Sequence, residues 1–144
     1  MISSTAVRSS EIEAIITQKQ APAGVVFEIV SDEADLLGEL LPSVRADITK
    51  LRQRFPGLPV AIVSHGSEQF ALTSKNYSTE QRTHDLVESL VRSDKVDVHV
   101  CATHAGWYGV SVEAFPDYVD VTAVAPALID DYEAIGYEII ILTE

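Results

Sequence analysis

Cys101 is the one cysteine of the chain, and it closes a run of alternating β-branched residues, Val96 to Cys101, that is typical of a buried strand. Thr103 can cap a helix that follows at once. A cysteine at such a junction meets the positive end of the helix dipole and unpaired N–H groups, here those of Ala102 to His104, which stabilise the thiolate. His104 could add positive charge or shuttle a proton. Spacing alone leaves two interpretations open, a reactive thiol and a small buried apolar side chain.

A second polar cluster follows the strand expected at 58–63, where the chain reads Ser64-His65-Gly66. Gly66 would let the backbone approach a ligand closely, so Ser64 and Gly66 are candidate binding residues. His65 either makes a local hydrogen bond in a polar turn or lies beside the active site. The Gly-rich phosphate loops and the GxSxG nucleophile elbow are absent, so Asp32 with Ser64 and His65 does not indicate a hydrolase.

His99, Cys101 and His104 together suggest a metal site of the form H-x-C-x-x-H. This spacing matches no standard zinc motif, and a central parallel strand has helices packed on both faces. We therefore predict no metal site, and expect His99 to pack under a helix with one hydrogen bond.

Three aromatic residues, Trp107, Tyr108 and Phe115, lie close after Cys101. They fit either the core or a subunit interface, where aromatic side chains are enriched. We favour the interface, and therefore expect the chain to form a symmetric homo-oligomer.

The elements that position these residues alternate along the chain. Strands are expected at 25–30, 58–63, 96–101, 119–121 and 137–142, and helices at 11–19, 36–55, 103–109 and 122–135, with a short one at 68–72 and another opened by a capping box at Ser78 to Gln81. Asp32 is expected to cap the second helix, Pro42 to kink or split it, and Gly136 to end the last one. The alternation predicts an α/β fold: a three-layer sandwich with a mostly parallel five-stranded sheet and helices on both faces. Ligands of such sheets bind beyond the carboxyl ends of the strands.

The 144 residues suit a single domain, which we place at 24–144, preceded by an extension at 1–23 that holds the short helix and a loose stretch at 1–9.

The formal net charge is −12, and no Lys or Arg follows Lys95. An acidic surface repels phosphate backbones, so nucleic acid is not an expected partner. There is no apolar run of membrane-spanning length and no signal-peptide pattern, and one cysteine cannot form an internal disulfide. We expect a cytoplasmic protein without membrane association.

Residues 24–144 resemble the DsrE/DsrF-like family of small sulfur-relay proteins, which includes the TusD/YchN-type members. The resemblance rests on His65-Gly66 after the second strand, on Val98-His99-Val100-Cys101-Ala102, on Gly109-Val110, on Glu113-Ala114-Phe115, on Val119-Asp120-Val121, and on the stretch from Ala127 to Tyr137. It implies a flavodoxin-like sandwich that assembles into trimers or hexamers, either homo-oligomeric or hetero-oligomeric. It also implies that the cysteine ending the third strand, Cys101 here, accepts sulfur. Many relay members carry Arg-Arg-Gly shortly after that cysteine, where this chain has Ala105 to Gly109.

We therefore predict a persulfide carrier, in which Cys101 accepts sulfur and His65 or His104 tunes its protonation. No cofactor is required, and the expected partners are sulfur-donor and sulfur-acceptor proteins. Two alternatives stay open. One is a non-catalytic oligomeric scaffold or small-ligand-binding protein of the same fold. The other is a redox-sensing thiol protein.

Overall fold

A computed structural model describes residues 4–143, and at its centre lies a five-stranded sheet in the order β4-β3-β2-β1-β5. The strands are β1 Gly24–Ile29, β2 Val60–Ser64, β3 Val96–Cys101, β4 Asp120–Thr122 and β5 Tyr137–Leu142. All four neighbouring pairs are parallel, so every strand ends at the same edge of the sheet. The predicted α/β sandwich is confirmed, and the sheet is fully parallel.

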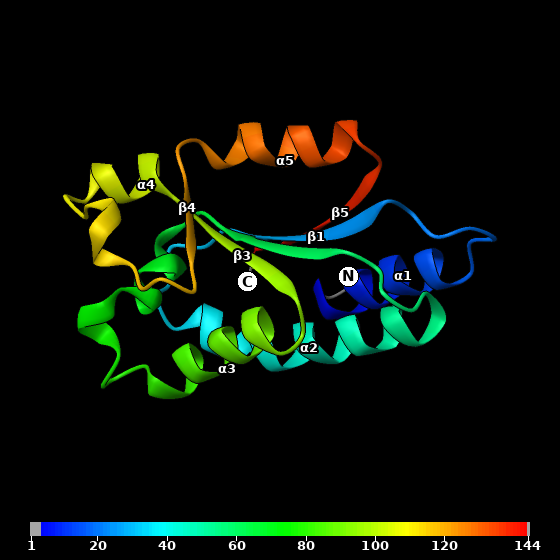
Figure 1. Cartoon of the computed structure of the whole chain (residues 1–144), viewed down its shortest axis with the longest axis horizontal. Helices are drawn as coiled ribbons and strands as arrows, with labels where there is room; N and C mark the ends of the chain where they lie inside the picture. The colour runs from blue at the N-terminus through cyan, green and yellow to red at the C-terminus, as the bar shows by residue number, and fades with distance from the viewer. Residues whose placement is uncertain (1–3, 144) are drawn as a thin grey trace.

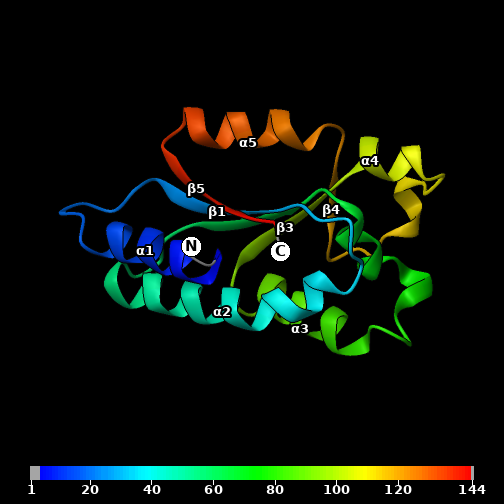
Figure 2. The ribbon, with the colours of Figure 1, turned by 180° about the vertical axis from the view of Figure 1, so that it is seen from behind.

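Helices cover both faces of the sheet. Figures 1 and 2 show α1 (Ser4–Ile16), α2 (Leu36–Arg54) and α3 (Gln81–Arg92) on one face, and α5 (Ala125–Ala134) alone on the other. The short α4 (Ala102–Trp107) continues directly from β3, beyond the carboxyl edge of the sheet. Three 3-10 turns, η1 (Ser67–Leu72), η2 (Ser74–Asn76) and η3 (Val112–Ala114), complete the connections. None of the helices in residues 4–143 is long and apolar enough to cross a membrane.

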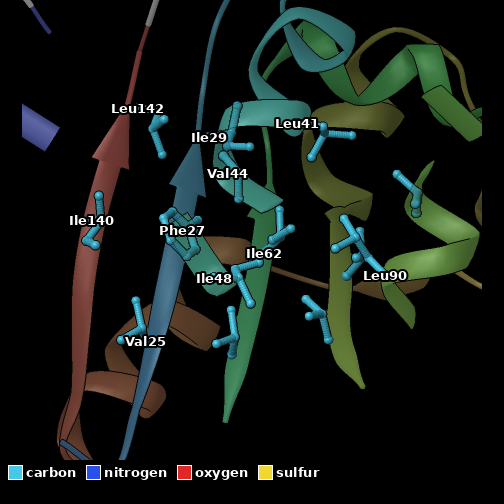
Figure 3. Close-up of a cluster of buried hydrophobic side chains, with 14 of the residues drawn as sticks. Val25, Phe27, Ile29, Leu41, Val44, Ile48, Ile62, Leu90, Ile140 and Leu142 are labelled. Carbon is cyan, nitrogen blue, oxygen red and sulfur yellow. The ribbon is translucent and has the colours of Figure 1, made fainter. Parts of the chain in front are cut away.

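The main core lies between the sheet and the three-helix face. Alternate residues of each strand point into it, for example Val25, Phe27 and Ile29 from β1, and they meet Val44 and Ile48 of α2 (Figure 3). Phe27, Ile29 and Val44 are each 0% exposed. This burial supplies most of the driving force for folding, and it fixes the strand register because a one-residue slip would turn every strand side chain to the opposite face.

The other residues of the strands face α5 and form a second, smaller core. It contains Val26 of β1, Ala61 and Val63 of β2, and Cys101 of β3, packed against Ala125 and Ile129 of α5. Because α5 is a single helix of 10 residues, it covers this face only in part. The face therefore keeps open space near the carboxyl edge, where the candidate site lies.

Several local expectations are wrong, and most concern helix starts. The second helix begins after Asp35 rather than Asp32. It is one continuous helix through Pro42, so of the expected kink or split the split is wrong. The third begins at Gln81, because the preceding residues are held in a turn by a Glu80 N–H to Asn76 O bond of 2.8 Å. α4 begins at Ala102, with Cys101 rather than Thr103 in the capping position. Gly136 ends α5 with a φ of +99°, as predicted, since glycine enters this left-handed region without strain.

The first helix is longer than expected. It begins at Ser4, so residues 4–9, predicted to be loose, are helical, while residues 1–3 lie outside the described part. Ile12 and Ile15 are buried in the main core, and Arg8 contacts Asp47 of α2 at 3.0 Å. The helix thus covers the region next to β5 and α2 as part of the same core.

Candidate functional site

A cavity of about 430 Å³ opens at the carboxyl edge of the sheet, on the α5 side. Its lining comes from the ends of four strands and the helices that follow them: Val30, His65, Cys101, Thr103, His104, Trp107, Val124 and Pro126. This is the edge at which parallel sheets bind ligands. A thiol, two imidazoles and a hydroxyl therefore share one otherwise apolar space.

Cys101 forms part of the cavity wall while remaining 4% exposed. Its side chain points to the α5 side, where it packs in the smaller core. Its backbone N–H donates to Oε1 of Gln69 at 2.7 Å, and Gln69 is itself fully buried in η1. The thiol is thus held by a rigid strand end, and it faces the cavity rather than the solvent.

His65 pairs with a carboxylate that sequence reasoning missed. Its Nε2 lies 2.9 Å from Oε2 of Glu28, and both side chains are largely buried. The β1–β2 register places Glu28 beside Val63, and both residues point to the α5 side along with His65. A signal was present in the sequence, because Glu28 interrupts an otherwise apolar strand. A carboxylate bonded to one imidazole nitrogen fixes the tautomer and orientation of the ring.

His104 lies on the other side of the cavity within a group of aromatic rings. It stacks on Phe70, with ring centroids 5.7 Å apart, and it contacts Trp107 and Tyr108 at 5.7 and 5.1 Å. Its Nε2 lies 3.3 Å from Oγ of Ser67. These contacts hold the ring at the cavity wall, where it faces the same space as Cys101.

Ser64 and Gly66 lie behind the cavity, and neither lines it. Ser64 donates its hydroxyl to the buried carboxylate of Glu68 at 2.6 Å, and the N–H groups of Gly66 and Ser31 donate to the same carboxylate at 2.9 and 2.6 Å. A Cβ at Gly66 would lie 2.5 Å from the backbone of Ser31. The glycine therefore permits a close approach between two protein segments, where we had expected an approach to a ligand. Glu68 ties the ends of β1 and β2 together.

Ala102 and Thr103 follow Cys101 directly, and only Thr103 lines the cavity. Its N–H and its hydroxyl both donate to the carbonyl of Ala123, at 3.2 and 2.6 Å. This N–H is therefore not free to stabilise an anion at Cys101, contrary to the expectation that all the amides of 102–104 would do so. The two bonds fasten α4 to the start of α5.

The three aromatic residues predicted at an interface have different environments. Trp107 is 75% exposed and Tyr108 is 63% exposed, whereas Phe115 is 7% exposed and belongs to the main core. The expectation that Phe115 is exposed is wrong. It follows η3, which turns the side chain inward against the three-helix face.

His99 lies away from the cavity, beneath α5. Its Nε2 is 3.0 Å from the hydroxyl of Tyr132, and burial lowers the pKa of the imidazole even though Asp120 and Asp97 act to raise it. The same burial, with negative charge nearby, raises the pKa of Tyr132 to about 12. Within residues 4–143, His, Cys, Asp and Glu form no group of three or more able to hold a metal ion.

Comparison with known proteins identifies the fold. A scan against protein-family models and a search of curated proteins found no match. Among solved structures, MTH1491 of Methanobacterium thermoautotrophicum, a protein of unknown function, is similar with a TM-score of 0.62 and 19% identity, over 82% of this chain and 97% of that one. The ychN protein of E. coli is similar with a TM-score of 0.55 and 15% identity, over 84% and 99%. The chain therefore has the fold of the YchN-type proteins, as its resemblance to the DsrE/DsrF-like family implied.

Proposed function

We propose that the protein is a persulfide carrier in which Cys101 holds the transferred sulfur. The observation that carries this proposal is the placement of the only cysteine of the chain in the wall of a cavity that it shares with two imidazoles. A neighbouring base can raise the fraction of a cysteine that reacts as thiolate at neutral pH, and a cavity gives a small sulfur compound access to it.

The loading step is a thiol–persulfide exchange. The Cys101 thiolate attacks the outer sulfur of a donor persulfide R–S–SH, a new S–S bond forms at Cys101, and the donor S–S bond breaks. The donor leaves as R–S⁻ and takes up a proton to become R–SH. No electrons are gained or lost overall, so no cofactor is needed. In the second step the thiolate of a partner protein attacks the outer sulfur of Cys101–S–SH and releases the Cys101 thiolate.

His65 is the base that receives the thiol proton and returns it to the leaving thiolate. Its bond to Glu28 orients the ring and stabilises the imidazolium that forms in between. His104 is the alternative for this role, and its stacked position on Phe70 keeps it at the wall of the same cavity. The remaining parts of the proposal are a cytoplasmic location and a homo-oligomer, a trimer or a hexamer, that covers Trp107 and Tyr108.

Intact-mass spectrometry tests the loading step. After incubation with a small persulfide, the wild-type chain should gain the mass of one sulfur atom, and that gain should return to zero when an acceptor thiol is added. Cys101→Ser is the control, and it should gain nothing because the chain has no other cysteine. An unchanged mass in wild-type protein with a free thiol would overturn the proposal.

The 4% exposure of Cys101 favours one alternative, a small-ligand-binding protein whose cysteine is only part of a wall. That protein would bind a ligand in the cavity without gaining sulfur. A redox-sensing thiol is distinguished by the reagent: peroxide would modify Cys101 to a sulfenic acid, and a persulfide would not load it.

A further inference from the structure

We infer that the Cys101 cavity binds an uncharged, apolar, low-molecular-weight thiol compound, and that the sulfur donor is the persulfide of such a compound. This inference rests on the proposed function for its sulfur chemistry, whereas its binding step stands without it. The cavity, of about 430 Å³, falls within the range of small-molecule sites, roughly 300–1,000 Å³.

The composition of the wall indicates the class of ligand. Four of the lining residues, Val30, Trp107, Val124 and Pro126, offer apolar surface, and none of the described lining residues is Lys, Arg, Asp or Glu. Two carboxylates lie close to the lining, and both already have partners: Glu28 is bonded to His65, and Glu68 accepts from Ser64, Gly66 and Ser31. An anionic compound entering this space would lose its hydration without meeting a fixed positive charge, which is costly. The net charge of −12 further disfavours anions.

The hydrogen-bonding capacity of the wall argues against a peptide segment as the occupant. The Nε2 atoms of His65 and His104 already face Glu28 and Ser67, and the Thr103 hydroxyl donates to Ala123 O. A peptide would bring N–H and C=O groups that need partners, and leaving them buried without partners is unfavourable. A small thiol carrying an apolar group needs only one polar contact at its sulfur. The second ring nitrogen, Nδ1, of His65 or His104 is the group that would supply it, since both residues line the same cavity as Cys101.

The test compares three methanethiosulfonate reagents of similar size that differ in charge: propyl (neutral), sulfonatoethyl (anionic) and trimethylammonioethyl (cationic). Each transfers its R–S group to Cys101 and releases methanesulfinate. Each rate constant is divided by the rate constant of the same reagent with a free model thiol, which removes intrinsic reactivity. We expect the normalised rate of the neutral reagent to exceed that of the anionic reagent at least about tenfold.

A matched pair of variants tests whether the cavity sets this preference. Val124 lines the cavity and Val112 does not, and both are 48% exposed, so either position accepts a lysine without loss of the core. Val124→Lys should raise the normalised rate of the anionic reagent several-fold, and Val112→Lys should leave it unchanged.

Three results would overturn the inference: equal normalised rates for the three reagents, a preference for either charged reagent over the neutral one, or no reaction of Cys101 with any of them. Failure of the proposed function looks different. If Cys101 prefers the neutral reagent but gains no sulfur from any persulfide, the apolar binding site is supported and the persulfide-carrier function is wrong. If sulfur is gained from a charged donor such as glutathione persulfide as fast as from a neutral alkyl persulfide, the carrier function is supported and the proposed class of donor is wrong.

Discussion

Cys101 combines two environments that are usually separate. One side of its side chain packs against Ala125 and Ile129, as a buried cysteine does, and the other faces a cavity that also contains His65 and His104. The structure thus shows burial of Cys101 and a place for it in the cavity wall, and the reactivity of its thiol stays a prediction. The reactivity of the thiol then depends on whether a base takes up its proton, and His65, bonded to Glu28, is the base that we propose.

Replacing Glu28 tests this pair. Glu28→Gln keeps the shape of the side chain and removes the charge that stabilises the imidazolium of His65. We expect alkylation of Cys101 near neutral pH to slow about tenfold, a modest part of what a positioned base contributes. The measurement is the rate of reaction with a neutral alkylating reagent in the folded protein.

The double variant separates positioning from a structural effect. If Glu28 acts through His65, adding Glu28→Gln to His65→Gln should slow the reaction no further than His65→Gln alone. Independent, multiplicative effects of the two changes would show that Glu28 does not act through His65.

A glycine pair tests the support behind the cavity. Gly66→Ala would place a methyl group 2.5 Å from the backbone of Ser31, and should cost roughly 1–3 kcal/mol in the free energy of unfolding. Gly106→Ala in α4 meets no neighbouring atom within 4 Å, and should be neutral or stabilising by up to about 1 kcal/mol. Urea denaturation measures both. Equal stabilities for the two variants would contradict the tight Ser31–Gly66 approach.

A hydrogen bond between α5 and β3 lies at the border of the smaller core. The His99–Tyr132 bond joins the two elements next to Ile129, and Nε2 of the neutral imidazole can accept a hydrogen bond from the tyrosine hydroxyl. Protonation of His99 would remove that acceptor and place a charge in a buried position. This junction should therefore weaken in acid.

The pH dependence of stability follows from the direction of the shift. Burial lowers the pKa of His99 below its ordinary value of 6.5, although Asp120 and Asp97 oppose it. A depressed folded-state pKa means that the unfolded chain binds the proton more tightly, so stability is present above pH 6.5 and is lost as the pH falls through the folded-state pKa. The free energy of unfolding of wild type should thus fall more between pH 7.5 and pH 5 than that of His99→Gln. An equal fall in the free energy of unfolding of wild type and His99→Gln would contradict this role of His99.

Tyr132→Phe probes the same junction at constant pH. It removes the hydroxyl bonded to His99 and keeps the ring, so we expect a loss of about 1 kcal/mol at pH 7.5 by urea denaturation. The double variant with His99→Gln should lose less free energy of unfolding than the sum of the two single losses, because both changes remove the same hydrogen bond. Full additivity would show that the bond does not contribute.

Strand prediction and helix-start prediction differ in success for a physical reason. The strands at Val96–Cys101 and Tyr137–Leu142 have the predicted bounds, because runs of β-branched and aromatic residues between turn signals depend on local pattern. The caps expected at Asp32, Ser78 and Thr103 are wrong, because other hydrogen bonds decide where each helix begins. Near Ser78 the competing bond is local, from Glu80 N–H to Asn76 O. Thr103, for example, bonds to Ala123, 20 residues away in sequence.

The site was predictable only in part for the same reason. Cys101, His65 and His104 line the cavity because each lies at a strand end or just after one, and strand ends can be found from the sequence. Glu28 and Gln69 reach the site through the strand register and through η1, and neither register nor the path of a turn can be read from spacing. Phe115 was misplaced because an aromatic residue after a short turn fits the core and the surface equally well.

The whole molecule is an acidic sandwich with an exposed aromatic pair at one edge. Trp107 is the last residue of α4 and lines the cavity, Tyr108 follows it, and the exposure of both is high for such large rings. In the homo-oligomer that we propose, this pair is covered. Because Trp107 is the only tryptophan of the chain, the tryptophan fluorescence of the protein measures whether this side chain is buried or exposed to water.

Oligomerisation gives the prediction at this scale. Light scattering should show a trimer or a hexamer, and Trp107 emission should shift to longer wavelength as the protein dissociates on dilution. Tyr108→Arg should shift the equilibrium toward monomer, and Val7→Arg, on the exposed side of α1, should not. A clean monomer for wild type at high concentration would contradict the proposal.

Transfer of labelled sulfur tests the central claim most directly. A neutral alkyl persulfide carrying a heavy isotope only in its outer sulfur is incubated with the protein, and the product is measured by intact and peptide mass spectrometry. The carrier predicts that Cys101 gains one heavy sulfur atom and that the unlabelled alkyl thiol is released. A gain of the whole alkyl–sulfur group, as in a mixed disulfide, or no gain at all, would contradict it.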